Sequence, residues 1–258
     1  MNTGEQIWGG FFGKYELPEN EVHVWQITLS MAASDFARMW QILAPDERER
    51  ADRFHFEADR RRAVIGRGYL RLLLGQIFNL PANNLQFQYD EFGKPGLLQK
   101  REPLVQFNVS HSGDLILIAI ARRLAVGVDV EKIRTDLDLA DIAARFFSAN
   151  ENERLASLAD PLRHKAFFTC WTRKEAYLKA RGIGLSLPLD QFDVSFLAGE
   201  DPQLLATRPD PAEARQWRLR GLELSGDYAA ALAAPSSNWS LRCWNWDPLV
   251  LIDATKSA

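Results

Sequence analysis

The sequence predicts an α+β protein made of two similar halves, each with helices followed by strands. Apolar residues recur at helical spacing over residues 45–79, and again over residues 137–158 and 161–181. Short alternating segments typical of strands follow each helical region, and no Gly-, Pro- or Ser-rich linker separates the halves. We therefore expect subdomains over residues 1–124 and 125–258.

The elements are predicted in chain order from their apolar pattern. Residues 22–29 alternate like a strand, and the helical region 45–79 reads as two pieces that end before Pro81. Later strands are predicted at residues 85–91, 105–110, 115–120, 125–131, 191–196, 216–222, 228–234 and 239–246, with turns or loops at residues 92–97 and 181–190. Residues 111–114 are expected to form a polar turn after the strand 105–110.

The composition is that of an ordinary globular protein, with 47% hydrophobic and 25% charged residues. No segment approaches the roughly 18 apolar residues of a membrane span, and no secretory signal is evident, so a cytoplasmic protein is expected. The net charge of −3 gives no argument for nucleic acid as a partner. The two cysteines, Cys170 and Cys243, lack metal-like spacing and are expected to be buried free thiols.

Positive charge is concentrated in residues 58–75, which carry five arginines and a single acid, Asp59. One interpretation is a solvated helix face with ion pairs such as Glu49–Arg53, which suits residues 46–53 well. The adjacent arginines at 60–62 have fewer acids nearby, so a bound anion is the alternative.

The segment 126–131, VGVDVE, alternates valines with acids. In a strand the valines would face a core, and Asp129 and Glu131 would stand together on the opposite, solvent-facing side. Two carboxylates this close repel each other unless a positive group lies between them, and hard oxygen ligands suit magnesium. The alternative is an edge hairpin whose acids simply point to water.

Residues 171–185 read as a helix that places Trp171, Glu175 and Lys179 on one stripe, with Lys174 beside it. This stripe is either a surface ion pair or a set of charges that faces an anionic ligand and its metal.

Ser110 and His111, with Asp129, could suggest a hydrolase. No GxSxG motif is present, and neighbouring Ser and His side chains point to opposite faces of a strand. Contacts from the hydroxyl and the imidazole to a phosphate are easier to arrange.

Together these segments resemble the 4′-phosphopantetheinyl transferases, in the double-length, surfactin-synthetase-activating type. The motifs that carry the resemblance are FGKPGL at 92–97, FNVSHSG at 107–113, VGVDVEKI at 126–133, RFFSANE at 145–151 and WTRKEAYLKARGIGLSLPL at 171–189. Five motifs in the family's order, over about residues 45–195, are far more specific than any one alone.

The resemblance implies two similar α+β subdomains related by a pseudo-twofold axis, with coenzyme A between them. It also implies functional residues at the positions that match the family's motifs. These are Asp129, Glu131 and Glu175 for magnesium; Arg50, Arg53, Arg62, Lys94, Ser110, His111, Lys174 and Lys179 for coenzyme A; and Glu175, Glu151 and Lys179 for catalysis. Glu47 stands where the family often has a lysine that helps to hold the 3′-phosphate, so the resemblance implies that this contact is lost while Arg50 remains.

The implied reaction transfers 4′-phosphopantetheine from coenzyme A to a serine of an apo acyl, peptidyl or polyketide carrier protein, releasing 3′,5′-ADP. Glu175 is the first choice for the general base, directly or through a metal-bound water, and Glu151 is the second. A module that binds coenzyme A or an adenine nucleotide without turnover is the alternative function. A monomer with no nucleic-acid or membrane partner is expected.

Overall fold

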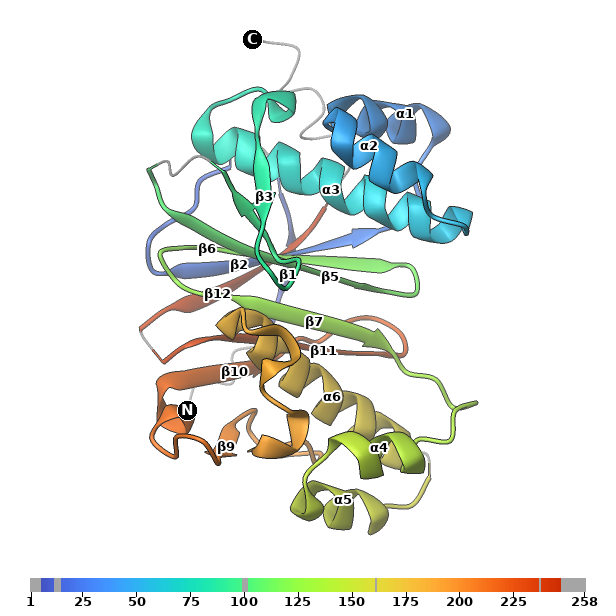
Figure 1. Cartoon of the computed structure of the whole chain (residues 1–258), viewed down its shortest axis with the longest axis vertical. Coiled ribbons are helices and arrows are strands. Elements are labelled where there is room, and N and C mark those ends of the chain that lie inside the picture. Colours follow the sequence, from blue (N-terminus) through green and yellow to red (C-terminus); the bar gives the residue numbers. More distant parts are fainter. Residues whose placement is uncertain (1–5, 12–14, 99–101, 161, 237, 247–258) are drawn as a thin grey trace. The chain divides into compact units, whose positions relative to one another are not determined.

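The computed structural model describes residues 6–11, 15–98, 102–160, 162–236 and 238–246 (Figure 1). The chain forms two compact units, and the second comprises Leu124–Asn238. The first unit contains the preceding residues together with the segment that begins at Trp239. The expected second subdomain ran to residue 258, whereas strand β12 (Ser240–Asn245) pairs with a strand of the first unit.

The first unit is built on a five-stranded sheet in the order β1-β12-β2-β6-β5. Besides β12, its strands are β1 (Trp8–Gly10), β2 (Glu21–Thr28), β5 (Val105–Ser112) and β6 (Leu115–Arg122). β2, β6 and β5 are antiparallel neighbours, whereas β12 runs parallel to β2 and β1. β6 is buried along all but its last residue, which explains its continuous apolar sequence.

Three helices and a hairpin complete the first unit. They are α1 (Ala33–Ile42), α2 (Pro45–Asp52), α3 (Glu57–Phe78), the short η1 (Ala82–Asn84), and β3 (Phe87–Tyr89) paired with β4 (Pro95–Leu97). The two-piece helix predicted over 45–79 is confirmed as α2 and α3, whereas α1 was not predicted. α3 ends where Asn79 adopts the left-handed conformation, two residues before Pro81.

The second unit has a three-stranded antiparallel sheet in the order β10-β11-β7. Its elements are β7 (Gly127–Lys132), α4 (Ala140–Phe146), α5 (Ala149–Ala156), α6 (Leu162–Arg181), η2 (Gly184–Ser186), η3 (Leu189–Gln191), β8 (Phe192–Val194), β9 (Leu204–Thr207), η4 (Glu213–Gln216), β10 (Trp217–Gly221) and β11 (Tyr228–Pro235). The single helix expected over 137–158 is two helices, because Ser148 leaves the helical conformation and caps α5.

The two units share one order of elements, with a strand, three helices, a small hairpin and two further strands. The spatial order is also the same, β2-β6-β5 in the first unit and β7-β11-β10 in the second, all antiparallel. The α+β class and the two similar units expected from the sequence are therefore confirmed. The pseudo-twofold axis that would relate the units stays a prediction.

Within the described part of the chain, no helix has the length and apolar character needed to cross a membrane. Cys170 and Cys243 are both buried and free, as the sequence predicts.

Candidate active site

Strand β7 directs its acidic residues toward helix α6 rather than toward solvent. A Cβ atom added to Gly127 would lie 2.2 Å from the carbonyl oxygen of Ala176 and 2.3 Å from the backbone nitrogen of Ala180, both on α6. Alternate residues of a strand share a face, so Asp129 and Glu131 face α6 as well. The solvent-facing side expected for these acids was therefore wrong.

The opposite face of β7 is also buried, since Val128 and Val130 are 0% exposed. On the face toward α6, the neighbouring strand β11 contributes only alanines. Ala229, Ala231 and Ala233 lie opposite Glu131, Asp129 and Gly127, respectively, in the strand register. Small side chains on the sheet and on the helix let the two backbones approach closely, so short acidic side chains reach groups on α6.

Asp129 meets Lys179 across this contact. Lys179 Nζ donates to Asp129 Oδ1 over 2.6 Å. The Asp129 side chain is only 4% exposed, whereas that of Lys179 is 29% exposed. The buried carboxylate is thus held by an ammonium that also reaches the surface, which leaves the ammonium able to meet a ligand from solvent.

Glu175 lies one turn before Lys179 on α6, and its environment disfavours the charged form. Burial raises the pKa of Glu175, and the nearby Asp129 and Glu131 carboxylates raise it further, while Lys179 opposes the shift. Three carboxylates and one ammonium therefore interact electrostatically within this unit. The structure brings together four residues that the sequence predicted as a group.

Trp171, expected on the same stripe of α6, takes no part in this charged group. Its ring stacks on Phe167 at a centroid distance of 6.0 Å and meets the edge of Phe146 at 5.8 Å. This residue belongs to the apolar core of the second unit.

Glu151 and Lys174 occupy a different place from the one predicted. Lys174 Nζ lies 2.7 Å from Glu151 Oε2, and both side chains are 0% exposed. The ammonium also donates to the carbonyl oxygens of Leu189 (2.7 Å) and Phe192 (2.5 Å). All of its donors are therefore used inside the protein, and Lys174 offers none to coenzyme A.

The Glu151 carboxylate is equally occupied. Its Oε2 accepts the backbone N–H of Ser148 at the start of α5, and its Oε1 accepts that of Val194 in β8. We name the Glu151–Lys174 pair, with these backbone bonds, the second brace. The prediction of Glu151 as a base and Lys174 as a coenzyme A ligand is corrected, because burial separates both groups from any substrate.

The first unit contains a matching pair, which we name the first brace. Glu47 Oε2 accepts from the backbone N–H of Ala44 at the start of α2 and from Arg71 Nε of α3, over 2.9 and 2.7 Å. Arg71 also donates to the carbonyl oxygens of Ala82 and Leu85. Glu47 is thus buried and bonded within the first unit. These bonds explain why an acid stands at the position where the family often has a lysine.

Arg62 lies beside the turn that follows β5. Its Nε donates to the carbonyl oxygen of Gly113 over 3.1 Å, and its guanidinium pairs with Asp59. The strand β5 extends through Ser112, so His111 belongs to the strand and not to a turn as expected. Ser110 is buried and His111 is exposed, so they point to opposite faces, as the sequence argument against a hydrolase required.

The other predicted anion ligands of the first unit lie on α2 and the β3–β4 hairpin. Arg50 pairs with Asp46 and stacks 4.2 Å from the centroid of the Tyr89 ring. Arg53 is mostly exposed, with Glu49 at 3.8 Å. Burial lowers the pKa of Lys94, in the turn between β3 and β4, against the attraction of Asp90.

Arg60 and Arg61 are both partly buried. The Arg60 guanidinium lies 4.7 Å from the centroid of Trp40, and that of Arg61 lies 4.8 Å from the centroid of Phe36. Both arginines therefore hold α1 against α3.

A magnesium ion suits the donor chemistry of the second unit. No group of three or more His, Cys, Asp or Glu side chains in the described ranges is arranged to hold a metal ion. Magnesium, however, is commonly bound by one or two carboxylates together with waters and substrate phosphates, not by a full protein cage. Asp129, Glu131 and Glu175 are hard oxygen donors, and their mutual repulsion would be relieved by a divalent cation.

The close approach at Gly127 was not predicted from the sequence. Glycine in VGVDVE carries no signal of what lies opposite it, because Ala176 and Ala180 are about 50 residues further along the chain. The motif alternation alone placed Asp129 and Glu131 on one face, without showing which element that face meets.

Comparison with known proteins gives a consistent result. The family model described as the 4′-phosphopantetheinyl transferase superfamily matches residues 125–233, and one described as 4′-phosphopantetheinyl transferase, N-terminal, matches residues 28–123. The chain is 37% identical over 231 residues to the 4′-phosphopantetheinyl transferase HetI of Nostoc sp. (strain PCC 7120), covering 89% of this chain and 94% of that protein. It is 32% identical over 173 residues to the 4′-phosphopantetheinyl transferase Sfp of Bacillus subtilis (strain 168), covering 67% and 74%.

Among solved structures, the holo-[acyl-carrier-protein] synthase of Thermotoga maritima is similar over 43% of this chain and 63% of that chain. The TM-score is 0.36 and the sequence identity is 19%.

Gly127→Ala should destabilise the fold, because the added Cβ would collide with backbone atoms of α6 that cannot rotate away. We expect a loss of about 1–3 kcal/mol or more in the free energy of unfolding, measured by urea denaturation. Gly96→Ala is the matched control, since no atom lies within 4 Å of its added Cβ. Equal stability of Gly127→Ala and the wild type would contradict the close contact.

Lys174→Met should destabilise the protein by about 3–5 kcal/mol, because it leaves the Glu151 carboxylate buried without its counter-charge. Adding Glu151→Gln should recover part of this loss, since the uncompensated charge is removed and an oxygen remains to cap α5. Lys165→Met, at an exposed position of α6, should change stability by about 0.5 kcal/mol or less. Chemical denaturation of the four proteins compares them, and a Lys174→Met variant as stable as Lys165→Met would refute the second brace.

Proposed function

This chain belongs to the 4′-phosphopantetheinyl transferase superfamily, and from its site we infer that it transfers 4′-phosphopantetheine from coenzyme A to a serine hydroxyl of an apo carrier protein, with release of 3′,5′-ADP. The observation that carries this inference is the group formed by Asp129, Glu131, Glu175 and Lys179, which lies within the family match at 125–233. Phosphoryl transfer requires positioned charges around a pyrophosphate, and this group supplies them.

We propose that Asp129, Glu131 and Glu175 hold a magnesium ion against the coenzyme A pyrophosphate. When bound, the ion would stabilise the negative charge that develops on the phosphate oxygens. Burial and the neighbouring Asp129 and Glu131 carboxylates raise the pKa of Glu175, so a positive ion shared by the three carboxylates would relieve their repulsion. Lys179 already reaches solvent from its contact with Asp129, so its ammonium is placed to bind a phosphate oxygen of the substrate.

Glu175 is our proposed general base. The carrier serine must lose a proton as it attacks the β-phosphate, and Glu175 belongs to the charged group at which we propose that the pyrophosphate binds, so its carboxylate is placed to take that proton. Its rival from the sequence, Glu151, is fully buried and accepts hydrogen bonds at both oxygens. The Glu151–Lys174 pair therefore holds α6 in place, and we propose that Glu175, which follows Lys174 on that helix, takes the proton.

The first unit supplies the basic side chains that we propose bind the remaining phosphates of coenzyme A. Arg62 donates to the carbonyl oxygen of Gly113, which lies two residues after the exposed His111. We propose Arg50, Arg53, Lys94, Ser110 and His111 as further ligands, as the resemblance implies. We propose Arg62 as the main ligand of the 3′-phosphate, because a planar guanidinium provides several donors to a doubly charged group.

The carriers are proposed to be acyl, peptidyl or polyketide carrier proteins, as in fatty acid, polyketide and nonribosomal peptide synthesis. Action as a cytoplasmic monomer stays a prediction from the sequence.

The direct test mixes the protein with coenzyme A, magnesium and an apo acyl carrier protein, and measures 3′,5′-ADP together with the mass of the carrier. Holo-carrier and 3′,5′-ADP should form in equal amounts, whereas a module that only binds coenzyme A would form neither. Asp129→Asn should lower the turnover number by about a hundredfold, since it removes a charge from the metal site. Asp136→Asn, at an exposed loop carboxylate, is the control and should keep full turnover.

The two candidate bases can be separated by parallel substitutions. Glu175→Gln should reduce the turnover number at saturating substrates by about a hundredfold or more, since a general base contributes on that scale. Glu151→Gln should keep the turnover number per folded molecule within about threefold of wild type, while its unfolding midpoint falls. The folded fraction is measured by circular dichroism in the assay buffer. An equal loss of turnover in both folded variants would contradict the assignment.

Arg62→Ala should weaken coenzyme A about ten- to a hundredfold, as expected for the loss of one charge-assisted contact of about 1.5–3 kcal/mol. Binding of dephospho-coenzyme A, which lacks the 3′-phosphate, should barely change. Isothermal titration calorimetry measures both affinities. Arg60→Ala, on the same helix, should leave both unchanged, and an equal loss of both ligands in Arg62→Ala would show that Arg62 only holds the turn.

A further inference from the structure

Strand β3 presents two aromatic rings to arginines of α2 and α3. Phe87 and Tyr89 alternate along the strand and therefore share a face. The Arg67 guanidinium lies 4.5 Å from the centroid of the Phe87 ring, and that of Arg71 lies 5.1 Å from the same centroid. The Arg50 guanidinium lies 4.2 Å from the centroid of the Tyr89 ring. Cations are attracted to the faces of aromatic rings, so this short strand gathers three positive groups.

Tyr89 joins two of these arginines. Its hydroxyl oxygen accepts a hydrogen bond from Arg67 Nη2 over 2.6 Å, while its ring meets Arg50. The Arg67 side chain is 16% exposed, whereas that of Arg50 is 40% exposed. The mostly buried arginine therefore fixes the tyrosine, and the tyrosine in turn holds the arginine that reaches solvent.

The three arginines outnumber the acids that they meet. Glu47 forms ion pairs with both Arg67 and Arg71. Asp46 pairs with Arg50. Over the part of the chain that the structure describes, these are the ion pairs of the three guanidiniums, so one positive charge is left over. Burial lowers the pKa of Arg67, and repulsion from the other two guanidiniums lowers it further, which Glu47 in part opposes. A bound anion would relieve this repulsion.

Arg50 keeps donors for such an anion. It donates from Nε and Nη2 to Asp46, and no hydrogen bond among the described residues uses its Nη1. Tyr89 pairs with Pro95 across the hairpin, next in the chain to Lys94, which we propose as a ligand of coenzyme A. The arginine cluster therefore lies beside a proposed coenzyme A ligand, and a phosphate group of that substrate is the anion that suits it.

From this geometry we propose that Tyr89 is a positioning residue, which directs Arg50 toward a phosphate of coenzyme A while Arg67 holds the tyrosine hydroxyl. This role rests on the proposed function, in which Arg50 is a ligand of coenzyme A. Tyr89 then acts through Arg50 and not by contact with the substrate. The 3′-phosphate and the pyrophosphate offer the same chemistry, and dephospho-coenzyme A distinguishes them in the test.

The test is a double-mutant cycle on Arg50 and Tyr89, with coenzyme A affinity measured by isothermal titration calorimetry on the full chain with magnesium and no carrier. Tyr89→Leu removes the ring and the hydroxyl, and should weaken coenzyme A about tenfold. Tyr89→Phe keeps the ring and should lose about threefold or less. In the Arg50→Ala background, Tyr89→Leu should cost less than about twofold more, because residues that act through one another are not additive.

Steady-state kinetics separate positioning from a general loss of structure. Tyr89→Leu should raise the KM for coenzyme A, and should keep the turnover number at saturating substrates and the KM for the carrier within about twofold of wild type. Because Tyr89 is 38% exposed, the unfolding midpoint measured by circular dichroism should also stay near that of the wild type.

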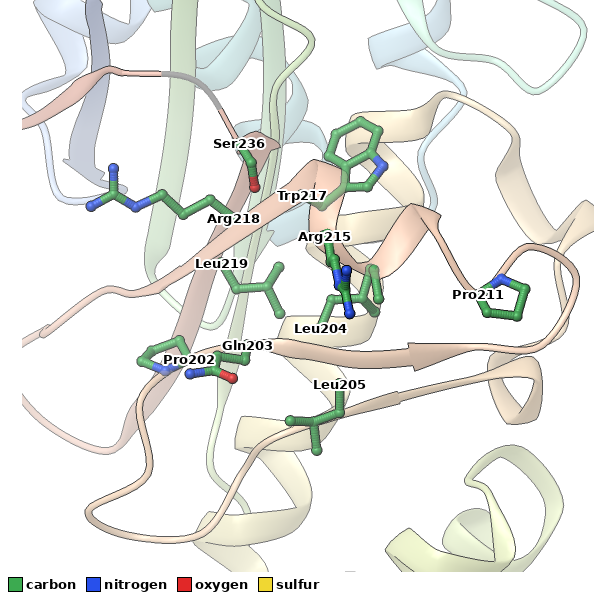
Figure 2. A pocket seen from close by; sticks show the side chains of 11 residues that line it. Pro202, Gln203, Leu204, Leu205, Pro211, Arg215, Trp217, Arg218, Leu219 and Ser236 are labelled. Carbon is green, nitrogen blue, oxygen red and sulfur yellow. The ribbon is translucent and has the colours of Figure 1, made fainter.

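Arg215→Ala is the control for the loss of one positive charge. Arg215 lines a cavity beside β9 and β10 in the second unit and is not among the proposed coenzyme A ligands (Figure 2). This variant should bind coenzyme A as the wild type does. A loss in Arg215→Ala equal to that in Arg50→Ala would overturn the proposal, because the effect would then follow from net charge alone.

The two phosphate sources give different results with Tyr89→Leu. A loss confined to coenzyme A assigns the 3′-phosphate, an equal loss with dephospho-coenzyme A assigns the pyrophosphate, and both support the proposal. The proposal is overturned if Tyr89→Leu binds coenzyme A as the wild type does, or if its effect is as large in the Arg50→Ala background as in the wild type. An additive cycle in a protein that forms 3′,5′-ADP refutes only the role of Tyr89, whereas a non-additive cycle in a protein that forms none refutes only the proposed transfer.

Discussion

A buried glutamate paired with a buried base on the third helix stabilises each unit. In the first unit Glu47 binds Arg71, and in the second Glu151 binds Lys174. Each glutamate also accepts the N–H that precedes its own helix, and each base donates to two carbonyl oxygens of the segment after the third helix. The pair thus joins three successive segments, and removing one member would leave a charge buried without compensation.

The two units use the same order of elements but pack their third helix differently. In the first unit, large residues such as Trp25, Ile118 and Leu73 fill the core beside α3. In the second unit, Gly127 and the alanines of β11 and α6 keep the backbones of β7 and α6 close together at this contact. The backbones lie close together there, which allows short carboxylates on β7 to meet Lys179 and Glu175. One fold therefore provides a helix packed on a bulky core in one unit and a charged strand–helix contact in the other.

The two lysines of α6 that form ion pairs, Lys174 and Lys179, differ in how far they are buried. Lys174 is wholly enclosed and all its donors are bound, so it serves the fold. Lys179, five residues on, pairs with a buried aspartate but keeps a path to solvent. Both side chains carry the same charge, and the difference in exposure follows from the rotation of about 100° per residue around the helix. Of the two lysines, only Lys179 is exposed to a ligand from solvent.

Local patterns in the sequence predicted the α+β class, the two-piece helix at 45–79, the shared strand face of Asp129 and Glu131, and the shared helix stripe of Glu175 and Lys179. Only the resemblance to the family implied that these four residues form one group. Apolar periodicity reports which residues are buried, and charged residues at strand and helix spacing report which of them share a face. The sequence could not show that Asp129 faces α6, because that depends on Gly127 meeting Ala176 and Ala180 far along the chain.

Nor could the sequence separate Glu151 and Lys174 from Glu175 and Lys179, since all four are charged residues in matching motifs. Tertiary burial distinguishes them, because Glu151 and Lys174 are wholly enclosed whereas Lys179 reaches the surface. The return of β12 to the first sheet likewise depends on long-range strand pairing with β2, which a local pattern does not record.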